Sequence, residues 1–127
     1  MIDKENEIFQ LVSKKLHEKY PVIYVIGSEL INTPPQFPAV SLVQTNNAVN
    51  NGYSTFKELE NVVREDYKAE VYSNLESGKE AQTKEITAVI SDVMKEIGYE
   101  RTFCEPIANS DSTINRRMSR FTKNNCI

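Results

Sequence analysis

The clearest hydrophobic pattern in the chain predicts an amphipathic helix over residues 77–98. Apolar side chains recur there at the spacing of one helical face, and charged side chains occupy the opposite face. Ser77 is the expected N-cap, with Glu80 completing a capping box, and Gly98 is expected to end the helix in the left-handed conformation. The buried face would consist of Ile86, Val89, Ile90, Val93, Met94 and Ile97.

The other periodic segments predict a further helix and several strands. Asp3 is the expected cap of a helix that runs to about Lys19, where Tyr20 and Pro21 end it. Residues 60–74 alternate between apolar and charged positions, which is typical of a strand with one face buried and one face in water. The remaining strands are expected at residues 22–26, 39–45, 99–107 and 113–122.

This order of elements, α-β-β-β-α-β-β, predicts an α+β fold in a single domain over residues 1–127. We expect a mainly antiparallel sheet of about five strands, with both helices packed on one face. Residues 28–38 carry three prolines and should form a loop. Residues 46–58, which are rich in asparagine, are expected to be a long mobile loop, and residues 122–127 a tail.

Composition and charge narrow the range of functions. The chain has 127 residues and a formal net charge of −3, which does not favour general nucleic-acid binding. The charge is uneven, because residues 112–127 contain four bases and no acid. The polar first residues predict no secretion signal, and no apolar run is long enough to cross a membrane. Cys104 and Cys126 match no metal or redox spacing and are expected to be reduced thiols.

A search for catalytic chemistry finds only weak candidates. His17 is the sole histidine, so no histidine pair can bind a metal, and Gly78-Lys79 lacks the rest of a phosphate loop. Asp66 and Glu70 share the expected solvent face of a strand, where charge is the ordinary condition. We therefore expect no enzymatic activity, no catalytic residues, no metal and no cofactor.

The C-terminal strand has a composition suited to contact with a partner. Apolar residues alternate there with arginines in a segment that carries no acid. Such mixtures occur at protein interfaces and on phosphate backbones, but the chain has neither a basic domain nor a nucleic-acid motif. A protein interface is the better interpretation, and Arg117→Glu is expected to impair assembly while sparing the fold.

Several short segments occur in an order that matches a known family. Residues 67–74 (YKAEVYSN) and 77–79 (SGK) precede the amphipathic helix, and residues 97–102 (IGYERT) and 109–116 (NSDSTINR) follow it, before Arg120-Phe121. The helix end at residues 19–21 and the strand at residues 37–43 (FPAVSLV) also fit. In this order the chain resembles the tail-completion proteins of long-tailed bacteriophages and prophages, also described as tail-terminator or minor capsid proteins. Asn115, in place of the family's usual aromatic residue, and the shorter C-terminal end depart from the pattern.

The resemblance implies a virion structural protein that forms a ring, expected to be a hexamer, on the end of the tail tube. Its partners would be further copies of itself, the tail tube protein, the head–tail connector and, in a contractile particle, the sheath protein. It would be assembled in the cytoplasm of the bacterial host and end up in the neck of the virion. Neither a membrane nor a specific nucleic acid is an expected partner.

In such a ring, the loops at residues 28–38 and 46–58 would contact a neighbouring subunit or the tube. The second loop would do so through Val49, Tyr53 and Phe56. The arginines of the C-terminal strand would pair with acids of a neighbouring copy. The charged residues assigned to these contacts are Arg64, Glu65, Asp66, Glu70, Arg116, Arg117 and Arg120.

Two other functions stay open. The chain could be another head–tail joining protein of the same particle, such as a connector stopper, which its position in the virion would reveal. It could also be a small nucleic-acid-binding or enzymatic domain. A steep loss of DNA affinity with rising salt would indicate the binding version of this alternative.

Overall fold

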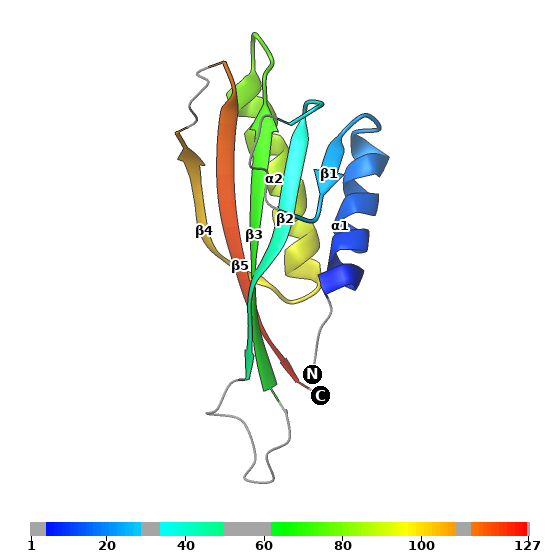
Figure 1. Ribbon diagram of the computed structural model, residues 1–127, viewed down its shortest axis with the longest axis vertical. Helices are drawn as coiled ribbons and strands as arrows, with labels where there is room; N and C mark the ends of the chain where they lie inside the picture. The colour runs from blue at the N-terminus through cyan, green and yellow to red at the C-terminus, as the bar shows by residue number, and fades with distance from the viewer. Residues whose placement is uncertain (1–4, 29–33, 50–61, 109–112, 127) are drawn as a thin grey trace.

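The computed structural model describes residues 5–28, 34–49, 62–108 and 113–126 (Figure 1). The helices and strands follow one another in the expected order, α-β-β-β-α-β-β, so the α+β fold class is confirmed. The elements are α1 (Glu5–Lys19), β1 (Tyr24–Ile26), β2 (Ala39–Val49), β3 (Val62–Ser73), α2 (Lys79–Glu96), β4 (Glu100–Ile107) and β5 (Asn115–Cys126).

The five strands form one sheet in the order β1-β2-β3-β5-β4, so β5 lies between β3 and β4. β1 runs parallel to β2, and the other neighbouring pairs are antiparallel. Both helices lie on the same side of the sheet, and Figure 1 shows α2 behind the strands and α1 beside it. We call the side without helices the open face. Its central residues are Arg64, Asp66, Lys68 and Glu70 of β3 and Arg116, Met118, Arg120 and Thr122 of β5.

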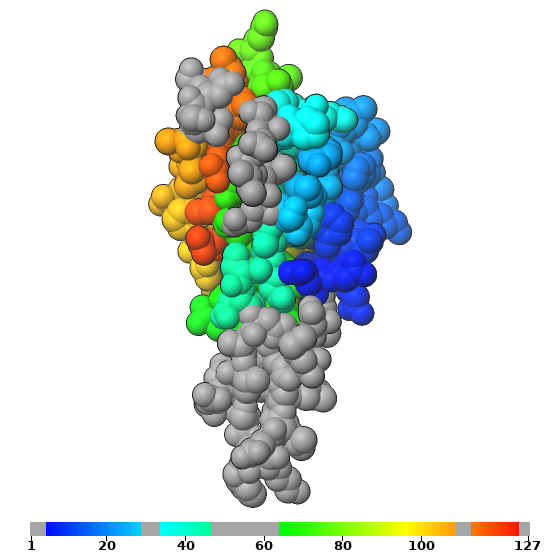
Figure 2. Space-filling model, in the orientation of Figure 1, coloured from blue at the N-terminus to red at the C-terminus, as the bar shows by residue number. Residues whose placement is uncertain are grey.

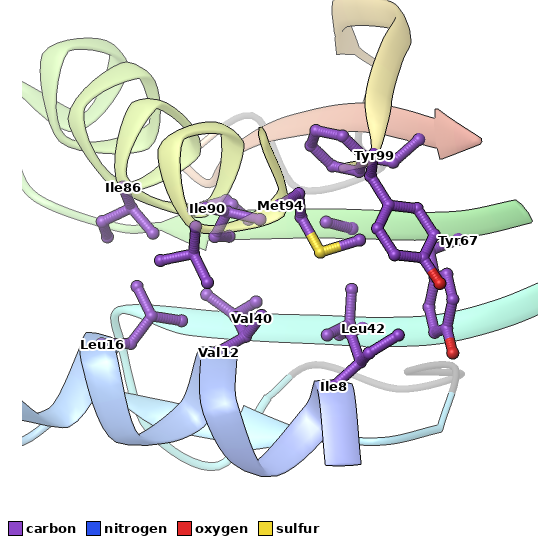
Figure 3. Packing of buried hydrophobic residues seen from close by; sticks show 14 of the residues in the cluster. Ile8, Val12, Leu16, Val40, Leu42, Tyr67, Ile86, Ile90, Met94 and Tyr99 are labelled. Carbon is purple, nitrogen blue, oxygen red and sulfur yellow. The ribbon is translucent and has the colours of Figure 1, made fainter. Parts of the chain in front are cut away.

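The hydrophobic core fills the space between the helices and the sheet. α2 turns its predicted apolar face, and α1 its residues Ile8, Val12 and Leu16, toward alternate residues of β2, β3 and β5, as the period of two in those strands requires (Figure 3). Tyr67 and Tyr99 meet edge to face, with ring centroids 5.4 Å apart. The central members of the cluster are Ile8, Val12, Leu16, Val40, Leu42, Tyr67, Ala69, Val71, Ile86, Ile90, Val93, Met94, Tyr99 and Phe121.

The two ends of α2 depart differently from the sequence prediction. The capping box at Ser77 is wrong, because the N-cap is Gly78 with φ of 85° and no side chain caps the helix. A left-handed residue at this position favours glycine over serine. At the other end Gly98 has φ of 91°, as predicted. Its N–H donates to the carbonyl of Lys95 at 3.0 Å, and that of Tyr99 donates to Met94 at 2.8 Å, which is a Schellman motif.

Two strands extend further than their local sequence suggests. β2 continues through residues 46–49, which were predicted to be loop, and β5 continues through residues 122–126, which were predicted to be tail. Each extension pairs with the start of β3, so cross-strand hydrogen bonding outweighs the low strand propensity of asparagine. In Figure 1 the ends of β2, β3 and β5 extend past both helices. Residues 50–61 and the predicted cap Asp3 lie outside the described residues.

Candidate functional site

The open face gathers most of the charged residues that the sequence assigned to an interface. Alternation along β3 and β5 places five of them there, in two groups along the two strands. Figure 2 views the molecule from this side, where β2, β4 and β5 contribute to the surface. Tyr53, Phe56 and the side chain of Val49 lie outside the described residues. The five residues on the open face are Arg64, Asp66, Glu70, Arg116 and Arg120.

The first group centres on Glu70, which is only 5% exposed and not in the solvent as expected. Arg116 donates to Glu70 Oε2 through Nε at 3.0 Å and through Nη2 at 2.7 Å. The hydroxyl of Tyr72 donates to the same oxygen at 2.6 Å, and Lys68 Nζ lies 3.4 Å from Oε1. Glu70 and Arg116, each predicted to pair with a neighbouring subunit, therefore form an ion pair with one another within the chain.

The protonation of Glu70 follows from these contacts. Burial alone would raise the pKa of its carboxyl. The hydrogen bonds from Tyr72 and Arg116, together with the charges of Arg116 and Lys68, outweigh burial and lower the pKa below its usual value. Glu70 therefore stays ionised near neutral pH and fixes Arg116 against the sheet.

Glu70→Gln is expected to lower the free energy of unfolding at pH 7 by about 1–3 kcal/mol, because it removes a charge-assisted hydrogen-bond acceptor. The folded-state pKa lies below the ordinary value of 4.5, so the ionised group stabilises the fold above that pH. This stabilisation disappears as pH falls through the folded-state pKa, and the difference between the two proteins should close. Urea unfolding at a series of pH values measures it.

Glu80→Gln is the matched control for this prediction. Glu80 pairs with Lys84 at 3.5 Å, but its side chain is 65% exposed. Water screens such a pair, so its loss should change the free energy of unfolding by less than about 1 kcal/mol. Equal effects of the two substitutions, or an effect of Glu70→Gln that does not change with pH, would contradict the assignment.

The second group lies at a recess where the sheet is irregular. The register shifts between Gln44 and Asn46 in β2, so that Thr45 is extra, and between Arg101 and Phe103 in β4, so that Thr102 is extra. Both irregularities fall at the same level, because Asn46 pairs with Asp66, Asp66 with Thr122, and Arg101 with Phe121. The recess between them is lined by Thr45, Arg64, Asp66, Tyr67, Thr102, Arg120 and Phe121.

The charged side chains of this recess differ in how many hydrogen-bond partners they have. Asp66 accepts from Arg64 Nε at 3.3 Å and from Asn46 Nδ2 at 3.1 Å, and Thr122 also bonds to it. Burial would raise the pKa of Asp66, but these bonds and the charge of Arg64 outweigh it and lower the pKa. Arg120 is exposed and has no hydrogen-bond or ion-pair partner among the described residues. The recess thus combines a neutralised carboxylate with an unpaired guanidinium.

Arg117 does not belong to the open face, which corrects the prediction that it contacts a neighbour there. Its side chain lies on the helix side of the sheet and is 8% exposed. Nη1 lies 4.0 Å from Cys104 Sγ, and Nε has no hydrogen-bond partner in the described structure. Glu65 is also on the helix side, where it accepts a hydrogen bond from the hydroxyl of Tyr99. The period of two could have shown this, since Arg116 and Arg117 are adjacent in a strand.

No group of three or more histidine, cysteine, aspartate or glutamate side chains in the described ranges is arranged to hold a metal ion. Among the same residues, no helix is both long and apolar enough to span a bilayer. Comparison with protein-family models gives no match, and no curated protein matches the chain.

Proposed function

We propose that this chain is a ring-forming tail-terminator subunit of a long-tailed phage or prophage particle, which caps the tail tube and meets the head connector. The order of family-like segments along the chain supports this proposal. Residues 67–74 lie in and just after β3, residues 77–79 begin α2, and residues 97–102 lead into β4. These segments thus fall on β3, α2 and β4, which follow one another along the chain.

The observation that carries the proposal is the charged open face. Neither helix covers it, and its charges follow β3 and β5 from Glu70 and Arg116 toward the recess. The side chains become more exposed in the same direction. Glu70 is 5% exposed, whereas the side chain of Arg64 is 58% exposed and Arg120 is exposed without a partner among the described residues. A subunit that binds a different surface of its neighbour head to tail can close a ring through such a face.

β4, at the sheet edge, favours contact through side chains over extension of the sheet between subunits. Its exposed Pro106 has no N–H to donate, and the irregularity at Thr102 interrupts its register. Charged Glu100 and Arg101 at the start of the strand add to this protection. We therefore place the subunit contact on the open face rather than on a strand added beside β4.

The proposal is tested by measuring native mass over a range of protein concentrations and imaging the protein with purified tail tubes. We expect six-subunit rings, either free at high concentration or seated on tube ends. A monodisperse monomer that ignores tube ends would contradict the proposal. If that monomer instead bound DNA with an affinity that falls steeply with salt, nucleic-acid binding would replace it.

Arg120→Glu is expected to abolish or weaken ring formation by about tenfold or more, because reversing a charge at a contact places like charges together. The side chain is exposed, so the thermal midpoint of the monomer should stay close to that of the wild type. Lys15→Glu makes the same charge change on the exposed side of α1 and should leave the rings intact. Loss of rings in both variants would indicate a general charge effect and contradict a specific contact.

A further inference from the structure

We infer that the recess between the two sheet irregularities is a binding site for an oxyanion, a carboxylate or phosphate group. Four strands contribute to it: Thr45 from β2, Arg64 and Asp66 from β3, Arg120 from β5 and Thr102 from β4. Side chains from segments far apart in the sequence therefore converge on one small hollow in the open face.

The two irregularities explain why a hollow exists at this level of the sheet. An extra residue bends its strand and turns side chains away from regular alternation. The extra Thr45 and the extra Thr102 lie on opposite sides of the central pair β3–β5, at the same height. Such features are frequent near binding sites. Here both place a threonine in the lining of the same recess.

The charges favour an anion over a cation. Arg64 and Arg120 contribute two positive charges and Asp66 one negative charge, and Asp66 already accepts bonds from Arg64 and Asn46. Lys68, which lies directly opposite Arg120 across the strands, is already paired with Glu70 at 3.4 Å. That pair leaves the positive charge of Arg120 without a counter-charge among the described residues.

The donors fit the geometry of an oxyanion. The guanidinium of Arg120 has no partner among the described residues, so its planar set of N–H groups is available for two parallel bonds to one carboxylate or phosphate. Arg64 also lines the recess, and its hydrogen bond to Asp66 uses only its Nε. The hydroxyl of Thr102 is a further donor in the lining.

The anion has two possible sources with the same chemistry: inorganic phosphate from solution, or a carboxylate side chain of a second copy of this chain. Binding of inorganic phosphate in the recess does not depend on the proposed function. Binding of a carboxylate from a second copy does, because it would make the recess part of the ring contact. The experiment therefore separates the free anion from the second copy.

The test uses the full chain labelled with ¹⁵N and follows the arginine Nε–H signals by NMR. At low protein concentration, inorganic phosphate is added while sodium chloride holds the ionic strength constant. We expect the signals of Arg64 and Arg120 to shift and saturate together. The signal of Arg101, which is exposed and bonded to Ser91, serves as the internal control and should not saturate. In a second series without phosphate, the protein concentration is raised, and the same two signals should shift if a second copy supplies the carboxylate.

Variants make the assignment specific. Arg120→Gln should weaken the response of Arg64 by about tenfold or more, and Thr102→Val by several-fold, because each removes a donor to the anion. Lys15→Gln, on α1, should leave it unchanged. No saturable shift in either series, an equal response of Arg101, or an unchanged response in Arg120→Gln would overturn the inference. Phosphate binding in a protein that forms no rings on tube ends would overturn the proposed function and leave the anion site standing.

Discussion

Val93→Asp is expected to unfold the protein at 25 °C. Val93 is 6% exposed and belongs to the core cluster between α2 and the sheet. Aspartate at this position would place a carboxylate among apolar side chains, where an unpaired charge costs several kcal/mol. A single domain of this size has a total stability of only about 5–15 kcal/mol, so most of that stability would be lost. Far-UV circular dichroism and thermal unfolding measure the effect.

Ala88→Asp is the matched control, because it introduces the same side chain on the exposed side of the same helix. Its thermal midpoint should stay within a few degrees of the wild type. If Val93→Asp instead kept a cooperative transition near the wild-type midpoint but changed the native mass, the apolar face of α2 would be a subunit contact rather than core.

The second large effect is expected at Arg117, where two substitutions should change stability in opposite directions. Arg117 is 8% exposed, its Nη1 lies 4.0 Å from the sulfur of Cys104, and its Nε has no hydrogen-bond partner in the described structure. Replacing such a buried charge by an apolar side chain of similar length is often stabilising. Arg117→Met should therefore raise the free energy of unfolding by about 1–2 kcal/mol, and Arg117→Glu should lower it by about 3 kcal/mol or more.

Chemical denaturation of both variants measures these changes, with Arg120→Glu as the control for charge reversal in the same strand. Arg120 is exposed, so its reversal should change the free energy of unfolding by about 0.5 kcal/mol or less. A clear loss of stability in Arg117→Met would contradict the prediction and show that the guanidinium makes net favourable contacts. The expected loss of stability in Arg117→Glu would replace the sequence-based expectation that this substitution spares the fold.

Hydrophobic periodicity was sufficient to predict the architecture. The apolar faces of both helices and the alternation of residues 67–71 identified the buried side of each element before the strands were paired. The residues at which strands end were harder to predict, because they depend on which neighbouring strand each one pairs with. The extension of β2 to Val49 is stabilised by pairing with β3, and that partner lies beyond a segment of twelve residues outside the described structure.

The candidate site was predicted only in part. Alternation placed Arg64, Asp66 and Glu70 on one side of a strand, as the structure confirms. The ion pair of Glu70 with Arg116 required knowledge that β3 and β5 are neighbours, although a helix and a strand separate them in the sequence. Neither irregularity has a sequence signal, since an extra threonine in a strand resembles any other strand residue. The recess therefore could not be predicted.

The position of β5 inside the sheet has a consequence for the order of folding during synthesis. β5 follows the other strands in the chain but inserts between β3 and β4, and it supplies Phe121 to the core. While the ribosome holds this segment, β3 has an unpaired edge and the charges of Glu70 lack Arg116. Pairing between segments so distant in sequence is slow to form. A nascent chain thus completes its open face only after β5 has been synthesised, which delays any association through that face until then.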